Sequence, residues 1–316
     1  MVEPVQTPES GDSREALLAW LLDSDPSIRW QVMRELMDQP DQVIARERTR
    51  IATDGWGVRL LEMRMPDGNW SDETFPGPGM GNTFALVLLK DLGLEPHCPQ
   101  ARGAIAAIRD GFTWVWHGNR PFFEGETEPC INGRVLAVGA YFGEASERLV
   151  DQLLEEQLQD GGWNCEAPDS HRSSFHTTIN VLEGQLEYER VYGASSPVTD
   201  ARARGQEYLL ERRMFRRLST GEVVNPEWLR FSFPPTYHYD VLRGLDYMRA
   251  AGVEYDDRMA EAIALVDNRR GPDDRWPMEF LHPDRFPLEM EPETSAASRW
   301  NTLRALRVLD RYAPGA

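Results

Sequence analysis

Apolar residues recur along the chain at the i, i+3, i+4 and i+7 spacing of one helix face, and runs that alternate apolar with polar positions are almost absent. The segment from Ile28 to Met37 is typical, with Asp25-Pro26 before it and Pro40 after it as start and stop signals. Helical periodicity from one end of the chain to the other predicts an all-α fold.

The predicted helices alternate between an apolar helix and a polar one rich in Arg and Glu. The apolar helices are expected to start near Ile28, Asn82, Cys130, Ser174, Tyr237 and Ser298, and the polar ones to cover residues 14–23, 43–64, 99–112, 147–159, 200–212 and 257–269. One helix pair cannot bury both of its faces, so successive pairs must stack. We therefore expect a single domain over residues 14–313, after a flexible N-terminus of residues 1–13.

Three of the connecting loops share one design, in which a polar helix ends, a tight acidic turn follows and a Trp closes the turn. These loops cover residues 65–70, 159–163 and 272–276, and they end at Trp70, Trp163 and Trp276. We expect each indole ring to pack back over the end of the preceding helix.

The middle turn, Gln157-x-x-x-Gly161-x-Trp163, has the form of the QW repeat of squalene-hopene and oxidosqualene cyclases, and Arg64 and Arg270 replace the Gln in the other two turns. The chain thus resembles the terpenoid cyclase and protein prenyltransferase superfamily over residues 15–312. The resemblance implies an α/α toroid, with six inner and six outer helices around a central cavity that takes a hydrophobic, isoprenoid-like molecule. The D-x-D-D motif of squalene-type cyclases does not occur here, which speaks against polyene cyclisation.

A zinc site is implied by the prenyltransferase branch of this superfamily, which holds Zn²⁺ with a D-x-C motif on one inner helix and a His on the next. Here Glu128-x-Cys130 opens one inner helix and His176 opens the next, so these three residues are the expected ligands. Cys165 precedes the second helix and is a candidate fourth ligand, which would close the site and make it structural. The alternative is that Cys130 and His176 are packed core side chains.

His238, Tyr239 and Asp240 form the other cluster suited to proton transfer, because a His near an Asp can act as an acid or a base. We expect catalytic residues among these three. A metal-free isomerase or lyase would use the His238 and Asp240 pair, or Cys130 as a nucleophile.

Substrate contacts are expected from aromatic and arginine side chains near the starts of the apolar helices. The aromatic candidates are Trp116, Phe233, Tyr237 and Trp300, and the candidates for holding an anionic end are Arg134, Arg243 and Arg304. The alternative for the arginines is an ion-pair network with carboxylates such as Glu183 and Asp246. A small-molecule site requires a cavity of at least ~300 Å³, and without one a non-catalytic helical-repeat binding module is expected instead.

Composition narrows the possible partners. The net charge of −18, from 34 basic and 52 acidic residues, disfavours nucleic acid and anionic membrane surfaces. No apolar run reaches the ~20 residues of a membrane span and the N-terminus has no signal-peptide pattern, so we expect a cytoplasmic protein. Three cysteines make a disulfide framework improbable, and no nucleotide-binding motif or common hydrolase motif occurs.

Overall fold

The computed structural model describes residues 10–70, 79–291 and 294–313. In these residues the regular structure is almost entirely helical. The strands among them are the short antiparallel pair β1 (Thr113–Trp114) and β2 (Arg120–Pro121). The all-α prediction is confirmed.

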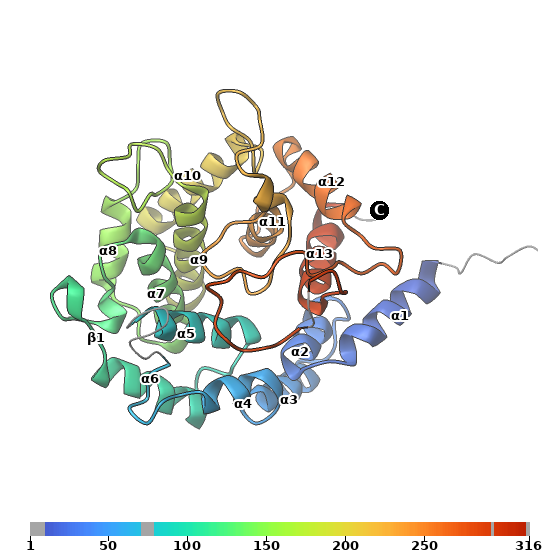
Figure 1. Cartoon of the computed structure of the whole chain (residues 1–316), viewed down its shortest axis with the longest axis horizontal. Helices are drawn as coiled ribbons and strands as arrows, with labels where there is room; N and C mark the ends of the chain where they lie inside the picture. Colours follow the sequence, from blue (N-terminus) through green and yellow to red (C-terminus); the bar gives the residue numbers. More distant parts are fainter. Residues whose placement is uncertain (1–9, 71–78, 292–293, 314–316) are drawn as a thin grey trace, which may run out of the picture.

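The α-helices form two concentric layers (Figure 1). The inner layer consists of α2 (Pro26–Glu35), α5 (Met80–Leu92), α7 (Pro129–Phe142), α9 (Phe175–Tyr192), α11 (Val241–Ala250) and α13 (Arg299–Tyr312). The outer layer consists of α1 (Ser10–Leu22), α3 (Asp41–Thr49), α4 (Gly55–Glu62), α6 (Pro99–Gly111), α8 (Glu147–Glu155), α10 (Ser196–Glu211) and α12 (Ala260–Asn268). Short 3₁₀ helices occupy η1 (Arg50–Ala52), η2 (Val115–His117), η3 (Phe122–Glu124), η4 (Pro226–Leu229) and η5 (Asp257–Met259). This arrangement confirms the predicted α/α toroid.

Side-chain hydrogen bonds close the inner layer into a ring. Arg307 Nη2 on α13 donates to Gln31 Oε1 on α2 at 2.7 Å, which joins the last inner helix to the first. On the other side of α2, Trp30 Nε1 donates to the carbonyl oxygen of Leu92, at the end of α5, at 2.9 Å. The helix pairs therefore form a closed ring and not an open superhelix.

The three Trp turns have one geometry. The indole Nε1 of Trp70, Trp163 and Trp276 donates to the carbonyl oxygen of Leu60, Leu153 and Val266, respectively, in each case at 2.7 Å. The backbone N–H of each Trp donates to a buried side-chain oxygen near the start of the next inner helix, from Asn82, Thr178 and Thr302. The contact of each indole with the end of the preceding helix agrees with the prediction, and the backbone hydrogen bond also ties the turn to the following inner helix.

Helices α7 and α9 approach backbone to backbone. A Cβ atom added to Gly133 would lie 2.5 Å from the Asn180 carbonyl oxygen, and one added to Gly184 would lie 2.2 Å from the Gly133 carbonyl oxygen. Only glycine allows this approach. The close contact brings Arg134 on α7 and Glu183 on α9 to the wall of the same cavity.

Apolar side chains fill the space between the layers, as predicted. The residues expected there are at most 5% exposed: Leu136, Val138, Leu182, Leu242, Leu245, Leu303 and Leu306. None of the helices in the described segments combines the length and the apolar character needed to cross a membrane.

The sequence placed three boundaries incorrectly. The outer helix predicted over residues 43–64 is divided into α3, η1 and α4, because Asp25 accepts hydrogen bonds from the backbone N–H groups of both Ser27 and Trp56 and so caps two helices. Helix α11 starts four residues after Tyr237, where Asp240 caps it by accepting from the Arg243 N–H. Helix α1 already begins at Ser10, so only residues 1–9 of the predicted flexible segment lie outside the described residues.

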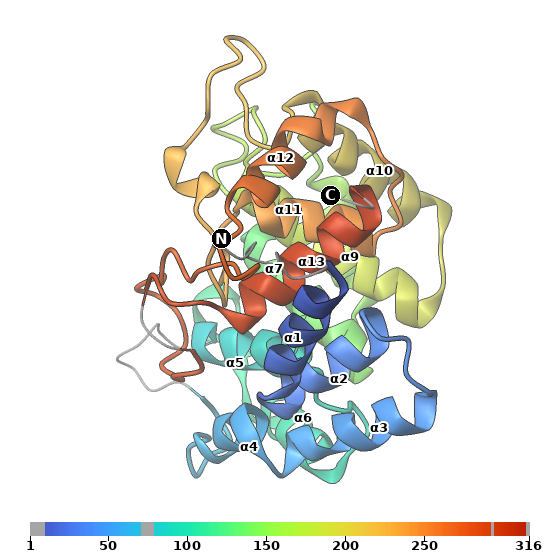
Figure 2. The same cartoon turned by 90° about the vertical axis from the view of Figure 1, so that its right-hand side faces the viewer.

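The long connections before α11 and α13 lie on one side of the ring, at the N-terminal ends of the inner helices (Figure 2). They carry most of the candidate site residues of the C-terminal half of the chain. On the opposite side of the ring, where the inner helices end, Glu35 forms ion pairs with Arg34, Arg249 and Arg307.

Candidate functional site

The centre of the toroid encloses a cavity of about 200 Å³. Phe84, Phe233, Phe286 and Trp300 contribute aromatic surface to its wall, and the rings of Phe233 and Trp300 stack with centroids 4.1 Å apart. Charged side chains complete the wall, from Lys90, Asp91, Arg134, Glu183, Glu187, Arg190, Arg243, Asp246, Arg304 and Arg307. The cavity is smaller than the ~300 Å³ that the sequence analysis required for a small-molecule site, so the helical-repeat binding module remains the alternative to such a site.

Arg134 is the exceptional charge on this wall. Its side chain is buried, with 3% of the residue exposed, and its guanidinium lies 4.4 Å from the centre of the Phe84 ring. No described residue offers an acceptor within hydrogen-bond distance of its Nε or Nη1 atoms. Burial, together with the nearby charge of Arg243, lowers the pKa of Arg134 to about 10, so the group is still a cation at neutral pH. The cavity therefore contains a buried positive charge without a partner.

Arg243 and Arg304, which the sequence offered as further anchors, already have partners. Arg243 pairs with both oxygens of Glu183, at 2.8 Å from Nε and 2.6 Å from Nη2. Arg304 Nη1 donates to the Ser232 carbonyl oxygen at 3.0 Å, and Nη2 lies 3.8 Å from Asp240 Oδ1. The ion-pair alternative describes these two arginines, which stabilise the ring.

Each of the four carboxylates on the cavity wall is ion-paired. Asp91 pairs with Lys90, Glu183 with Arg243, Glu187 with Arg190 and Asp246 with Arg249. Burial alone would raise the pKa of Glu183 and Asp246, but the neighbouring arginines outweigh it and hold both pKa values below their ordinary range. These two groups are therefore ionised at neutral pH and cannot donate a proton.

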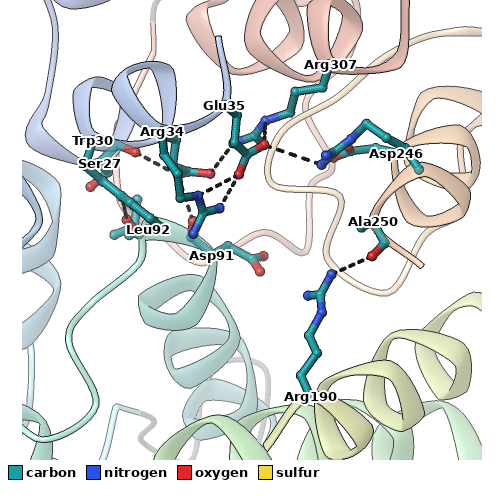
Figure 3. A network of polar contacts seen from close by, with 12 residues as sticks. Ser27, Trp30, Arg34, Glu35, Asp91, Leu92, Arg190, Asp246, Ala250 and Arg307 are labelled. Atoms are coloured by element: carbon teal, nitrogen blue, oxygen red, sulfur yellow. Dashed lines mark hydrogen bonds and ion pairs between the residues drawn. The ribbon is translucent and has the colours of Figure 1, made fainter. Parts of the chain in front are cut away.

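A dense ion-pair network lies where the inner helices end (Figure 3). Glu35 at the end of α2 contacts Arg307 Nε at 2.5 Å and Arg249 Nη2 at 3.6 Å, and it also pairs with Arg34. Burial alone would raise the pKa of Glu35, but the charges of these arginines lower it below its ordinary value. At this end of the ring, positive and negative groups lie in ion-pair contact, although Glu35 Oε2 and Arg307 Nε make no hydrogen bond among the described residues.

At the other end, the structure changes the predicted zinc site. Glu128, Cys130 and Cys165 have donor atoms within 4.8 Å of one another, but His176 is not in this group. His176 Nδ1 instead accepts a hydrogen bond of 2.7 Å from the backbone N–H of Tyr239. A metal-bound His carries a proton on its second ring nitrogen. Since a proton on Nδ1 would face that N–H donor, this arrangement does not suit His176 as a zinc ligand, and the structure does not bring it together with Glu128 and Cys130.

The two thiols near Glu128 contact each other and their surroundings. Cys130 Sγ lies 3.6 Å from Glu128 Oε2, and Cys165 Sγ lies 3.4 Å from Thr177 Oγ1. The interaction with the nearby Cys165 thiol and the burial of Cys130 raise the pKa of Cys130 above its ordinary value. A protonated thiol is a poor nucleophile, so this environment disfavours Cys130 as the attacking group of a metal-free enzyme.

The predicted catalytic cluster is divided between structural and chemical roles. Tyr239 is buried and its hydroxyl donates to the Met214 carbonyl oxygen at 2.5 Å, so it fixes the chain. Asp240 caps α11, burial raises its pKa, and its Oδ2 has no partner among the described residues. His238 does not pair with Asp240; its Nε2 lies 3.2 Å from Oδ1 of Asp284.

His282 and Asp284 are functional candidates that the sequence analysis missed. Together with His238 they form a second group whose donor atoms lie within 4.8 Å of one another. The His282-Pro283-Asp284 spacing was available in the sequence, but it lies in a long segment without helical periodicity. Burial and the neighbouring His238 lower the pKa of His282 to about 3, and burial with His238 and Arg243 lowers that of His176 to about 4. Both imidazoles are therefore neutral at physiological pH.

A pocket of about 40 Å³ adjoins this second group. His176, His238, Asp240 and His282 line it together with Trp228 and other residues, and it shares no lining residue with the central cavity. The predicted catalytic residues thus line this pocket, whereas four of the predicted substrate-binding residues line the central cavity: Arg134, Phe233, Arg243 and Trp300.

Two predicted aromatic contacts remain. Tyr237 is 36% exposed, its ring stacks on His238 with centroids 4.0 Å apart, and it does not line the central cavity. The side chain of Trp116 lies outside the described part of the chain.

Neither a protein-family model nor a curated protein matches the sequence. Among solved structures, the apo form of the type II terpene cyclase MstE from Scytonema is similar at 16% identity and a TM-score of 0.47, over 95% of this chain and 96% of that chain. A variant of the same enzyme in complex with merosterolic acid A is similar at 17% identity and a TM-score of 0.46. Another variant, in complex with geranylgeranyl dihydroxybenzoate, is similar at 16% identity and a TM-score of 0.44. Each comparison covers 96% of this chain and 97% of that chain. At this level the likeness concerns the course of the backbone and transfers no residue roles.

Proposed function

We propose that the protein binds a hydrophobic, isoprenoid-like small molecule with one anionic end in the central cavity of its toroid, and that Arg134 pairs with that end. The observation that carries the proposal is the buried guanidinium of Arg134, two of whose nitrogens have no partner in the described chain. Burying a charge without a partner costs several kcal/mol. An anionic ligand offsets this cost by supplying the missing partner, and a carboxylate or a phosphate group suits a guanidinium best.

The apolar part of the ligand is proposed to lie against Phe84, Phe233 and Trp300, which line the same cavity. Aromatic walls favour an apolar body through buried area and favour positive charge through their ring faces. A volume of about 200 Å³ supports a compact molecule, or the head of a longer one, because pockets for drug-sized ligands begin near ~300 Å³.

The proposed function does not include protonation of the ligand by carboxyl groups of the cavity wall. The carboxylates that line the cavity are paired with basic residues, and an adjacent cation favours the ionised form of a carboxyl group. Together with the missing D-x-D-D motif, this favours binding and positioning of an anion over cyclisation of a polyene.

A binding series tests the proposal. Calorimetry with aliphatic carboxylates and monophosphates of increasing chain length should show affinity in the wild type, and Arg134→Met should lower it by about ten- to a hundredfold, as for a lost charge-assisted pair of ~1.5–3 kcal/mol. Arg134→Lys should retain part of the affinity, since it keeps the charge and loses the bidentate geometry.

The matched control is Arg190→Met. Arg190 lines the same cavity, but its side chain is 48% exposed and already pairs with Glu187, so this variant changes the net charge equally without removing the unpartnered group. Equal affinity of the wild type and Arg134→Met for every member of the series would refute the proposal. Native mass spectrometry of the purified protein, with and without the Arg134 substitution, provides a second test through any retained small molecule.

A further inference from the structure

Three side chains from two distant segments meet at the N-terminal end of the ring. His238 belongs to the connection before α11, and His282 and Asp284 belong to the connection before α13. One ligand atom from each lies within 4.8 Å of the others, and His238 Nε2 lies 3.2 Å from Asp284 Oδ1. In a tetrahedral site with metal–ligand bonds of ~2.0–2.1 Å, neighbouring ligand atoms lie about 3.3 Å apart. The distance between His238 Nε2 and Asp284 Oδ1 is close to this value.

The groups around these three side chains leave them available for a cation. The rings of His238 and His282 are stacked, with centroids 3.9 Å apart and an angle of 7° between their planes, so their in-plane lone pairs do not point at one position. One of the two rings must therefore rotate when both bind the same ion. Among the described residues, the His282 ring nitrogens have no hydrogen-bond partner. The Thr236 hydroxyl lies 3.4 Å from Asp284 Oδ2, on the oxygen that does not contact His238, and so it orients the carboxylate in the way that supporting groups orient metal ligands.

We propose that His238, His282 and Asp284 bind one divalent transition-metal ion at the N-terminal mouth of the toroid. Two imidazoles and one carboxylate form a ligand set that suits Zn²⁺, Fe²⁺ or Co²⁺ better than Mg²⁺ or Ca²⁺, which prefer oxygen ligands. Three protein ligands leave at least one position open, and the adjoining pocket of about 40 Å³ has room for a bound water or one oxygen of a small ligand.

His176 has a defined role next to this ion. Its Nδ1 accepts from the Tyr239 N–H, so the proton of the neutral ring is on Nε2. Because His176 lines the same pocket, it is a hydrogen-bond donor available to an oxygen bound to the metal. This assigns His176 to the surroundings of the metal and not to its ligand set.

Metal titration of the full chain tests the proposal. After treatment with a chelator, calorimetry with Zn²⁺ should give one ion per chain, and Co²⁺ should produce visible absorption bands without the near-ultraviolet sulfur-to-cobalt band. His282→Ala and Asp284→Asn should each weaken Zn²⁺ binding at least about tenfold. Asp284→Asn nearly preserves the shape of the side chain, so it remains informative if His282→Ala does not fold.

Two controls separate this site from other metal binding. His97→Ala removes an exposed imidazole elsewhere on the chain and should leave Zn²⁺ binding unchanged. The double variant Cys130→Ser/Cys165→Ser removes the neighbouring thiols and should also retain one Zn²⁺ per chain. Loss of binding in the double variant with retention in Asp284→Asn would place the metal on the thiols and overturn the proposal, as would the absence of stoichiometric binding in the wild type.

Discussion

The two ends of the ring handle buried charge in opposite ways. Where the inner helices end, Glu35 contacts three arginines, and Gln31 and Arg307 connect the first and last inner helices (Figure 3). Toward the N-terminal ends, Arg134 has two buried nitrogens without a hydrogen-bond partner among the described residues. Buried polar groups that satisfy each other stabilise a fold, whereas unsatisfied ones persist where something else uses them. We therefore infer that the end of the ring where the inner helices terminate stabilises the fold, and that the N-terminal end binds a ligand.

The largest change in stability is expected when the ion-pair network around Glu35 is broken. Glu35→Gln removes the negative charge of a side chain that is 17% exposed, so Arg307 loses its ion-pair partner and Arg249 keeps only Asp246. We expect a loss of about 3–5 kcal/mol in the free energy of unfolding, the range for breaking a buried ion pair by removing one member. Urea unfolding measures this loss.

The control for this prediction is Glu254→Gln. Glu254 also pairs with an arginine, Arg311, but its side chain is 85% exposed, so the expected loss is at most about 1 kcal/mol. If Glu35→Gln cost no more than Glu254→Gln, the network at the end of the ring would not be the stabilising element that the comparison requires.

A second effect is the pH dependence of the same network. The pKa of Glu35 is below its ordinary value in the folded protein, so the stability it contributes is fully present above the unfolded pKa and is lost as the pH falls through the folded pKa. The difference in unfolding free energy between the wild type and Glu35→Gln should therefore shrink on acidification. Urea midpoints of both proteins across a pH series measure this. A difference that stayed constant or grew as the pH fell would contradict the sign.

Asp240, near the opposite end, should respond in the reverse direction. Burial raises its pKa, so protonation of Asp240 favours the folded state as the pH falls. The pH dependence of wild-type stability contains the contributions of both Glu35 and Asp240. Subtracting the pH dependence measured for Glu35→Gln isolates the contribution of Glu35.

The fold could be predicted from the sequence because its signals are local. Five of the six inner helices begin within two residues of the predicted positions, since residues such as Ser174 and Ser298 cap their helices and the Trp turns mark the ends of outer helices. The exception, α11, follows Pro234 and Pro235, and its first turn is set by Asp240, whose capping contact with Arg243 the periodicity did not reveal.

The candidate site was harder to predict because its partners are distant in sequence. Arg134, Arg243 and Arg304 occupy similar positions on three inner helices, yet only the structure shows that Glu183, on α9, reaches Arg243 and leaves Arg134 unpaired. His176 failed as a ligand for the same reason, because the N–H of Tyr239, far along the chain, occupies its Nδ1. Sequence spacing located the mouth of the ring but not the pairing of groups within it.

The smallest expected change in stability tests whether the buried Arg134 charge destabilises the protein when no ligand is bound. Arg134→Met removes a buried, unpartnered charge and keeps an apolar chain of similar length beside Phe84. Replacing buried ionic groups by apolar ones is often stabilising, so we expect the ligand-free protein to gain roughly 1–2 kcal/mol in unfolding free energy. The ligand-free state is prepared by unfolding and refolding the purified protein, and urea unfolding gives the difference. Arg243→Met is the matched comparison, because it removes an equally buried arginine and leaves Glu183 without its partner; it should destabilise the protein. If both substitutions destabilised the protein to the same extent, Arg134 would be satisfied in the ligand-free state, and the contrast between the two ends of the ring would not hold.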